Sequence, residues 1–555
     1  MKLIQKIILL TSWIFLVPGC SEDWLNEKPP HLITTESLYA TYEGFETGLN
    51  GLYALVREER EGRDGTNYLR ADVFMNGTDN MVTNHRDGFS RVAEDWVNQN
   101  NPFNADISST FTWLYRIVNS ANTIINQATS RDDIDWRGGS RGEIENKNAV
   151  LAEAKALRAW AYRHLTFGWG DVPLNLEESL GSNIKTDWTR TDVDVVRNQM
   201  KSDWIFAQQH LDSEPPIPGK ISKGAVQHYL SELYLIQNKP DSVLYWADQV
   251  INNPAYGLIT ERYGVRSNEP GVPFMDMFYD GNSNREEGNK EALWVWQFEY
   301  ETIGGGGSIM RRWHTSRYAD ISINGVRPLQ YTLERGGRGV TRISLTKWAI
   351  DNYEPQDDRA SNFAIRKYFI LRDDTENAPA SADRLPPGYQ YGDTIFLKWD
   401  EDISENARNR VDWPFSRKYD STIETNLQEA AQYNDQVYLR LAETYLLKAE
   451  AQFLLGASED AAQTLNIIRE RAHASPIPAD SVSIDFILDE RSRELVFEEH
   501  RRYTLLRTGK WLERVRRHNH NGGQLATERD QLFPIPQSVI DANLTEEMTQ
   551  NPGFN

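Results

Sequence analysis

The chain has 555 residues, of which 39% are hydrophobic and 25% are charged, and its formal net charge is -21. This balance is typical of a folded globular protein and excludes a disordered or largely membrane-embedded chain. Nucleic acids and anionic membrane surfaces are disfavoured partners, because binding them requires a concentrated basic footprint. Neutral ligands remain as candidates.

The first 19 residues are typical of a secretion signal. Lys2 and Lys6 precede an apolar run at residues 7–17, which is too short to span a bilayer. The run ends at Val17-Pro18-Gly19-Cys20, which is similar to the lipobox of a bacterial lipoprotein, although Pro18 is an unusual occupant. We therefore expect removal of residues 1–19 and lipidation of Cys20.

Cys20 is the only cysteine of the chain, which excludes an internal disulfide and a multi-cysteine metal site. Several acyl chains on this residue would hold the protein at a membrane without a spanning helix, since each buried methylene contributes roughly 0.8 kcal/mol. Residues 21–23, Ser-Glu-Asp, are similar to acidic signals that direct some lipoproteins to the outer face of the outer membrane. By charge alone they equally fit a solvated linker.

Two segments carry apolar residues at helical spacing, with steps of three and four residues. The first runs from Val150 to Leu165 and the second from Leu439 to Phe453. Both predict amphipathic helices.

Helices are also predicted in pairs joined by short turns. A helix at 223–237 is followed by Asn-Lys-Pro-Asp and by a second helix at 242–251, with Asp241 or Ser242 as the expected N-cap. The same layout returns at 437–455 and 459–472, with Gly456 placed to end the first helix. Each pair is a tetratricopeptide-like unit, and one unit cannot bury both of its faces, so stacked units are expected.

Between residues 261 and 434 the helical period disappears. Glycine-rich stretches such as 304–307 and 336–339 alternate with short apolar segments and clustered aromatic residues. Long irregular segments in compact proteins usually carry function. This pattern predicts a mainly α protein whose helical scaffold, 20–260 and 435–555, supports an irregular ligand-binding excursion at 261–434.

Signals for catalysis or metal binding are weak. Residues 138–142 fit the G-x-S-x-G spacing, but the polar stretch before them favours an interhelical loop over the strand that a nucleophile elbow needs. The chain contains no H-E-x-x-H, P-loop or EF-hand motif. His518 and His520 lie among arginines, which favours exposed polar surface over a metal site. We predict no catalytic residues, no metal and no cofactor.

Seven segments, spread over nearly the whole chain, are informative together: 20–30 (CSEDWLNEKPP), 113–125 (WLYRIVNSANTII), 152–174 (AEAKALRAWAYRHLTFGWGDVPL), 437–472, 487–511 (ILDERSRELVFEEHRRYTLLRTGKW), 532–540 (LFPIPQSVI) and 550–554 (QNPGF). In sequence and in order they resemble the SusD/RagB family of nutrient-binding outer-membrane lipoproteins. The resemblance implies a single α-rich unit of tetratricopeptide-like helix pairs. It also implies a non-catalytic surface protein that captures a glycan and passes it to a SusC-like TonB-dependent transporter.

The charged residues within these segments are expected to stabilise the scaffold and not to bind the ligand. They stand beside core positions of predicted helices and are expected to form structural ion pairs: Arg158, Arg163, Glu490, Arg491, Arg493, Glu494, Glu498, Glu499 and Arg501.

Sugar binding needs flat apolar rings and planar hydrogen-bonding groups, because pyranose faces present C–H bonds and their edges present hydroxyls. The chain has 17 Trp, 24 Tyr and 20 Phe, and several tryptophans fall in irregular segments. The candidate ligand-binding residues are Trp96, Asn98 and Asn100 in one polar loop, and Tyr300, Arg311, Arg312, Trp313, His314 and Tyr318 around the 304–307 glycine run. Weaker candidates on a second rim are Tyr389, Tyr391, Trp399 and Trp413, whereas Trp294, Trp296 and Trp348 are expected in the core.

Two other classes of function remain open. A tetratricopeptide-like scaffold would bind a peptide or protein in a groove lined by helix side chains. A surface hydrolase would need two carboxylates about 5 to 9.5 Å apart, which 81 acidic residues do not exclude. The sequence names neither the glycan nor the number of sites, and it is silent on a structural calcium ion and on the transporter partner.

Overall fold

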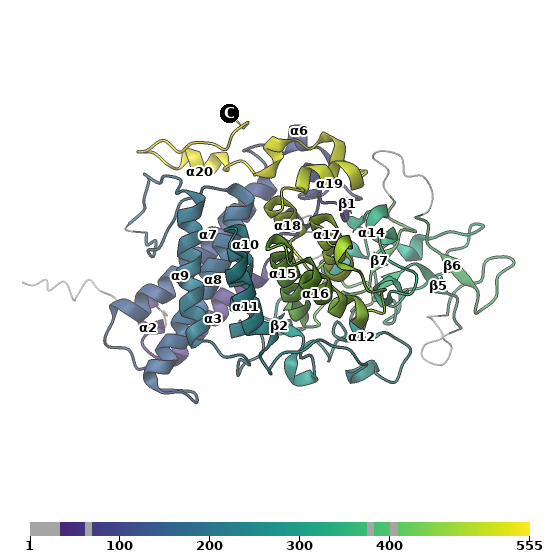
Figure 1. The fold of residues 1–555 in the computed structure, drawn as a ribbon, viewed down its shortest axis with the longest axis horizontal. Helices are drawn as coiled ribbons and strands as arrows, with labels where there is room; N and C mark the ends of the chain where they lie inside the picture. Colours follow the sequence, from purple (N-terminus) through teal and green to yellow (C-terminus); the bar gives the residue numbers. More distant parts are fainter. Residues whose placement is uncertain (1–33, 62–68, 182, 374–381, 400–408, 555) are drawn as a thin grey trace, which may run out of the picture.

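The computed structural model describes residues 34–61, 69–181, 183–373, 382–399 and 409–554. The predicted signal and the predicted lipidation site at Cys20 lie outside these residues. The fold is mainly α, as predicted, with long helices side by side and short, scattered strands (Figure 1). Among the described residues, no helix combines the length and the apolar character needed to cross a membrane.

The scaffold is a row of packed helices. Each helix in the series α7, α8, α9, α10, α11, α15 and α16 packs against the next. Figure 1 shows these helices side by side. The helices before residue 260 are α2 (Thr35–Leu38), α3 (Tyr42–Arg57), α4 (Asp72–Met75), α5 (Ser90–Glu94), α6 (Trp96–Gln99), α7 (Ala105–Ser130), α8 (Glu143–Trp169), α9 (Val193–His210), α10 (Lys223–Ile236) and α11 (Pro240–Ile251). Those after residue 435 are α15 (Leu441–Leu454), α16 (Ser458–Arg471), α17 (Ile484–Leu495), α18 (Arg501–Arg507), α19 (Trp511–His518) and α20 (Gln537–Asp541).

The segment between these two groups is irregular, and it lies at one end and along one edge of the scaffold (Figure 1). It contains α12 (Pro273–Asp276), α13 (Met310–His314) and α14 (Lys347–Asp351). The strands of the molecule are β1 (Met81–Thr83), β2 (Ala292–Trp296), β3 (Ile343–Leu345), β4 (Ile365–Arg366), β5 (Tyr368–Ile370), β6 (Thr394–Phe396), β7 (Phe415–Ser416) and β8 (Gln436–Arg440). They form the two-stranded antiparallel sheets β1–β3, β2–β8, β4–β7 and β5–β6. The division of the chain at residues 260 and 435 stays a prediction.

The predicted helix pairs are confirmed, with two corrections at their ends. The helix α11 begins at Pro240, not after Asp241 or Ser242, because proline lacks the N–H that the first turn leaves unpaired and its φ is already helical. Residues 437–440 are not helical, because they pair with β2 in the register Ala292↔Arg440 and Trp296↔Gln436. Gly456 ends α15 as expected, with a φ of 79°.

The core is centred on α8, whose predicted apolar positions are fully buried from Val150 to Leu165. Trp160 of this helix meets Trp113 of α7 and the β2 residues Trp294 and Trp296 edge-on. Trp296 in turn stacks on Tyr438 of β8, with ring centroids 3.9 Å apart. The core positions expected for Trp294 and Trp296 are confirmed, and the helical scaffold is joined to β2 and β8 through these rings.

Buried ion pairs connect the irregular segment to the C-terminal helices. Arg440, which ends β8, binds Glu291 at 2.8 Å and Glu498 at 2.6 Å, and it also pairs with Glu494 of α17. Arg359 binds Glu494 at 2.9 Å and Glu490 at 2.8 Å. The prediction that the charged family motifs form structural ion pairs is confirmed here, and it holds also for Arg158 with Asp203, Arg163 with Glu232, Arg491 with Glu499 and Arg501 with Asp79.

Residues 138–142 form a loop that leads into α8, with Gly142 at its N-cap, as expected for this stretch. The His518 ring stacks on Trp348, with centroids 4.5 Å apart, so this side chain is half-buried and packs against an aromatic ring.

Removing one buried partner of the network tests its contribution to stability. Arg440→Met leaves Glu291, Glu494 and Glu498 without their shared cation, so we expect the free energy of unfolding to fall by about 3–5 kcal/mol. Arg517→Met is the matched control, because Arg517 is exposed and its contact with Glu513 is 3.8 Å. Urea unfolding should show little change for the control, and equal stability of the two variants would contradict the role given to Arg440.

Acid should weaken the same network. Burial alone would raise the pKa of Glu490, but Arg359, Arg493 and Arg469 lower it to about 2. Because the folded pKa lies below that of the unfolded chain, roughly 4.3, the stabilisation is present above that pH and is lost as the pH falls towards 2. The melting temperature of the wild type should exceed that of Glu490→Gln at neutral pH, and the difference should shrink as the pH falls from roughly 4.3 to about 2. A difference that stays constant over this range would contradict the prediction.

Candidate functional site

The structure buries most of the predicted ligand-binding residues. The buried ones are Trp96, Asn100, Arg311, Arg312, Trp313, His314 and Tyr318. The expectation that Trp96 and Trp313 present exposed ring surfaces is therefore wrong. Trp96 packs edge-on against Trp511 at 5.4 Å, and Trp313 lies in a separate apolar cluster with the Arg342 guanidinium 4.8 Å above its ring.

The polar members of this group also have structural partners. Arg311 donates to the carbonyls of Arg338 and Glu429, and Tyr318 donates to the Gly337 carbonyl at 2.8 Å. The His314 ring lies 4.2 Å from Phe497. These side chains hold the irregular segment together.

Two predicted residues remain at the surface. Asn98 is exposed, and its amide donates to the Asp95 carboxylate at 3.0 Å. Tyr300 is 38% exposed, and its ring meets Tyr433 edge-on with centroids 4.9 Å apart. On the second predicted rim Trp413 is buried and Tyr391 is exposed.

A groove runs beside the C-terminal half of α3, and Tyr433 is part of its wall. We call it the α3 groove, and it consists of three adjoining hollows. The first hollow has a volume of about 960 Å³ and lies between α3, the loop at 299–307 and residues 429–433. The second hollow, of about 430 Å³, shares Arg57, Ile303 and Gly304 with the first.

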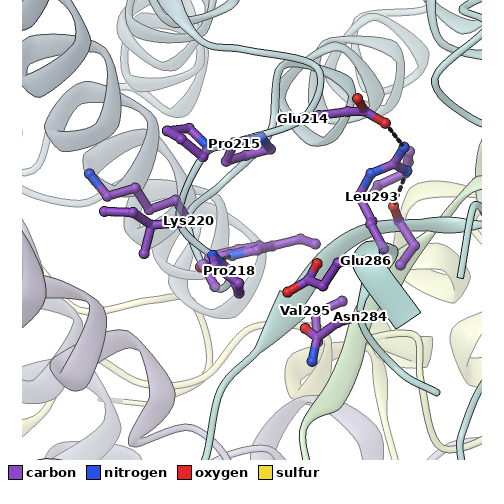
Figure 2. A pocket seen from close by; sticks show the side chains of 14 residues that line it. Glu214, Pro215, Pro218, Lys220, Asn284, Glu286, Leu293 and Val295 are labelled. Atoms are coloured by element: carbon purple, nitrogen blue, oxygen red, sulfur yellow. Dashed lines mark hydrogen bonds and ion pairs between the residues drawn. The ribbon is translucent and has the colours of Figure 1, made fainter. Parts of the chain in front are cut away.

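The third hollow, of about 460 Å³, continues from the second through residues 217–220. Figure 2 shows Pro215 and Pro218 on one side of it, and Asn284 and Glu286 on the other. Shared lining residues make the three hollows one continuous, open groove.

The loop at 299–307 gives the first hollow its shape. Gln297 and Phe298 connect it to β2. The loop closes on itself through hydrogen bonds from Glu299 N to Gly305 O at 3.0 Å and from Gly305 N to Thr302 O at 2.9 Å. Gly306 has a φ of 69°, and a Cβ at this position would lie 2.4 Å from the Glu61 carboxylate. The backbone conformation at position 306 therefore favours glycine.

Arg57 fastens this loop to α3. Its guanidinium donates to the carbonyls of Gln297 and Gly304, the latter at 2.6 Å, and it lies 5.6 Å from the Phe298 ring centroid. Burial lowers the pKa of Arg57 from its ordinary value. The side chain thus links α3 to the loop, and it is partly shielded from water.

Acidic side chains dominate the first hollow. Five of its lining residues are glutamates, Glu58, Glu61, Glu299, Glu301 and Glu429, whereas the lining arginines are Arg57 and Arg70. The negative charge of Glu301, together with a hydrogen bond to its side chain, raises the pKa of Tyr300. The site therefore combines phenol rings, peptide groups and carboxylate acceptors, which suits binding of a polar ligand that donates hydrogen bonds.

One buried group of side chains elsewhere has the composition of a metal site. Glu59, His164 and His500 lie close together, but His500 Nε2 is 2.7 Å from Glu59 and its Nδ1 is 3.0 Å from the Arg163 guanidinium. Tyr438 also donates to Glu59 at 2.8 Å. The arginine and these hydrogen bonds make the group a structural network.

Sequence reasoning missed most of the groove. Arg57 is the last residue of α3, Glu58 follows it as the C-cap, and Tyr433 stands alone in a polar stretch, so no local pattern marks them. A usable signal was the segment Glu214-Pro-Pro-Ile-Pro-Gly-Lys220, whose prolines break the helical pattern and form one wall of the third hollow.

Comparisons with known proteins give consistent results. Residues 290–554 match the model described as the SusD family, and residues 23–235 match the model described as starch-binding and associating with the outer membrane. The chain is 26% identical to the SusD-like protein P25 of Formosa agariphila, and the match covers 92% of this chain and 91% of that protein.

Solved structures have the same fold. A laminarin binding SusD-like protein superimposes with a TM-score of 0.67 at 21% identity, covering 92% of this chain and 99% of that one. For B. fragilis NanU the TM-score is 0.68 at 20% identity, with 95% and 99% covered. These likenesses confirm the predicted architecture of tetratricopeptide-like helix pairs.

The burial of Trp313 determines what its substitution should do. Trp313→Ala removes a large side chain from a packed cluster, so we expect the free energy of unfolding to fall by about 3–5 kcal/mol. Tyr300→Ala is the control, because its side chain is 38% exposed and its loss should leave stability within about 1 kcal/mol. Thermal unfolding compares the two, and a fully stable Trp313→Ala protein would contradict the packing described above.

Proposed function

Because the chain belongs to the SusD family, we propose that it is a non-catalytic binding protein that captures a glycan in the α3 groove. The observation that carries this proposal is the first hollow, an open cavity of about 960 Å³ whose wall includes Tyr433, with Tyr300 packed edge-on against that ring. The laminarin binding protein of the same fold supports a glycan as the ligand.

The groove has the chemistry that a sugar chain requires. Aromatic rings lie against the C–H face of a pyranose, while hydroxyls at its edge bind peptide carbonyls, amides and carboxylates. Tyr433 supplies the ring, and Glu299, Glu301 and Gln297 supply acceptors along the first and second hollows. Ile303 is fully exposed at the tip of the loop and adds apolar surface between these hollows.

The proposal includes a location and a partner. Outer-membrane association is supported by the description of the family model that matches residues 23–235. We propose that an acylated Cys20 anchors the protein there, facing the cell exterior, and that a SusC-like TonB-dependent transporter receives the glycan. Bacteria that express the protein and grow with a radioactive fatty acid test the anchor. The wild-type protein should carry the label, and the Cys20→Ser variant should not.

The peptide-binding scaffold is less well supported than the glycan site. A scaffold groove would be lined by helix side chains, whereas the α3 groove has one helix on one side and loops on the others. A hydrolase would release products, so chromatography of glycans incubated with the purified protein separates it from a binder.

The ring of Tyr433 provides the direct test of the site. Tyr433→Ala removes a sugar-stacking surface, so we expect affinity for the bound polysaccharide to fall by about 1–2 kcal/mol, which is roughly tenfold. Affinity gels with a panel of soluble polysaccharides identify a ligand, and calorimetry then compares the variants.

Two controls keep this test specific. Tyr433→Phe retains the ring and should retain most of the affinity. Tyr245→Ala removes a tyrosine that is 58% exposed on α11, away from the groove lining, and should bind as the wild type does. Unchanged affinity in Tyr433→Ala would move the glycan site away from the α3 groove.

A further inference from the structure

We propose that the α3 groove selects uncharged glycans and excludes chains that carry uronate or sulfate groups. This inference rests on the proposed glycan-binding function and adds the chemical class of the ligand. It follows from which charged side chains of the groove are free and which are already paired.

The free charges of the first hollow are negative. Glu299 and Glu301 are exposed and Glu429 is partly buried, and none of the three forms an ion pair with a basic residue of the described chain. Glu429 accepts hydrogen bonds from the backbone N–H groups of Ala430 and Ala431, so its carboxylate is held at the wall of the hollow.

The positive charges of the groove are committed to protein partners. Arg57 binds two backbone carbonyls of the loop, and Arg70 lies 3.2 Å from the Glu58 carboxylate. In the second and third hollows Lys220 binds Glu46 at 2.6 Å and Glu153 at 3.0 Å, and Arg285 binds Glu214 at 2.8 Å.

The pairing of Lys220 also affects its pKa. Burial lowers this pKa, but Glu153 and Glu46 together raise it above the ordinary value for lysine. The ammonium group is therefore held by its own carboxylates, and binding a ligand anion would break that arrangement.

Recognition of a carboxylate or sulfate usually uses arginine or lysine donors. An anionic sugar in the α3 groove would meet Glu299, Glu301 and Glu429, and every lysine or arginine among the described lining residues already has a protein partner. A neutral sugar instead offers hydroxyl hydrogens, and a carboxylate accepts these well. The same side chains thus favour one class of glycan and repel the other.

The groove is open along its length, so an internal segment of a long chain can lie in it. Exposed charges separated by more than about 10 Å are screened at roughly 0.1 M salt. Only charges of the segment inside the groove therefore decide selection, and the effect should depend on salt.

Paired polymers test this inference. Laminarin, starch, xyloglucan and galactomannan are each compared with their own derivative carboxylated at C6, in EDTA so that no divalent cation bridges two carboxylates. For the neutral polymer that binds, we expect its carboxylated derivative to bind at least about tenfold more weakly at roughly 20 mM salt, with a smaller gap at about 300 mM.

The charge variant supplies the second readout. In Glu299→Gln combined with Glu301→Gln, the affinity ratio of carboxylated to neutral polymer should rise towards one. Glu470→Gln removes an exposed glutamate of α16 that does not line the groove, and its ratio should equal that of the wild type.

The outcomes separate this inference from the function on which it rests. Equal or tighter binding of the carboxylated polymer by the wild type, or an unchanged ratio in the double variant, would overturn the charge selection and leave glycan binding intact. Failure of the wild type to bind any polymer, neutral or carboxylated, would overturn the proposed function and the selection with it.

Discussion

Arg440 is buried at the end of β8 and binds carboxylates that precede β2 and belong to α17 and the turn after it. A buried cation of this kind is retained only when its partners are all in place, because an unpaired buried charge destabilises strongly. The pairing fixes β2 against β8, and Leu441 N donates to Glu291 O at 2.9 Å beside it. The direction in which the chain leaves β2 is thereby fixed, and the groove loop begins at that point.

From β2 the constraint passes to the proposed ligand site. Phe298 N donates to the Asp435 carboxylate at 2.9 Å, and Arg57 of α3 holds the carbonyls of Gln297 and Gly304. The loop is therefore held both by the strand that precedes it and by a helix from the other end of the sequence. Such support keeps Tyr300 beside Tyr433 before a ligand arrives, which reduces the loss of conformational freedom on binding. The rigid scaffold thus fixes the position of the surface loop.

The sequence predicted the scaffold well and the site poorly, for physical reasons. Helical periodicity reports which face of a segment is buried, so α8, α10 and α15 follow from the spacing of residues such as Leu157 and Leu230. The irregular segment has no period, and Trp313 is buried in a cluster assembled from distant residues that include Met75 and Leu345. Tyr300 was proposed as a ligand-binding residue because it adjoins the glycine run, and its role stays a prediction. Arg57, Glu58 and Tyr433 come together only through tertiary contacts, so local patterns did not identify them.

Hydrogen–deuterium exchange in the presence of a bound glycan tests the central claim, that the α3 groove is the binding site, because it reports protection along the whole chain without prior choice of residues. Glycan binding in the α3 groove predicts slower exchange in peptides that cover residues 297–307 and 429–433, with unchanged exchange in peptides that cover β5, β6 and α16. Protection confined to β5, β6 or the scaffold helices, with residues 297–307 unaffected, would contradict the claim.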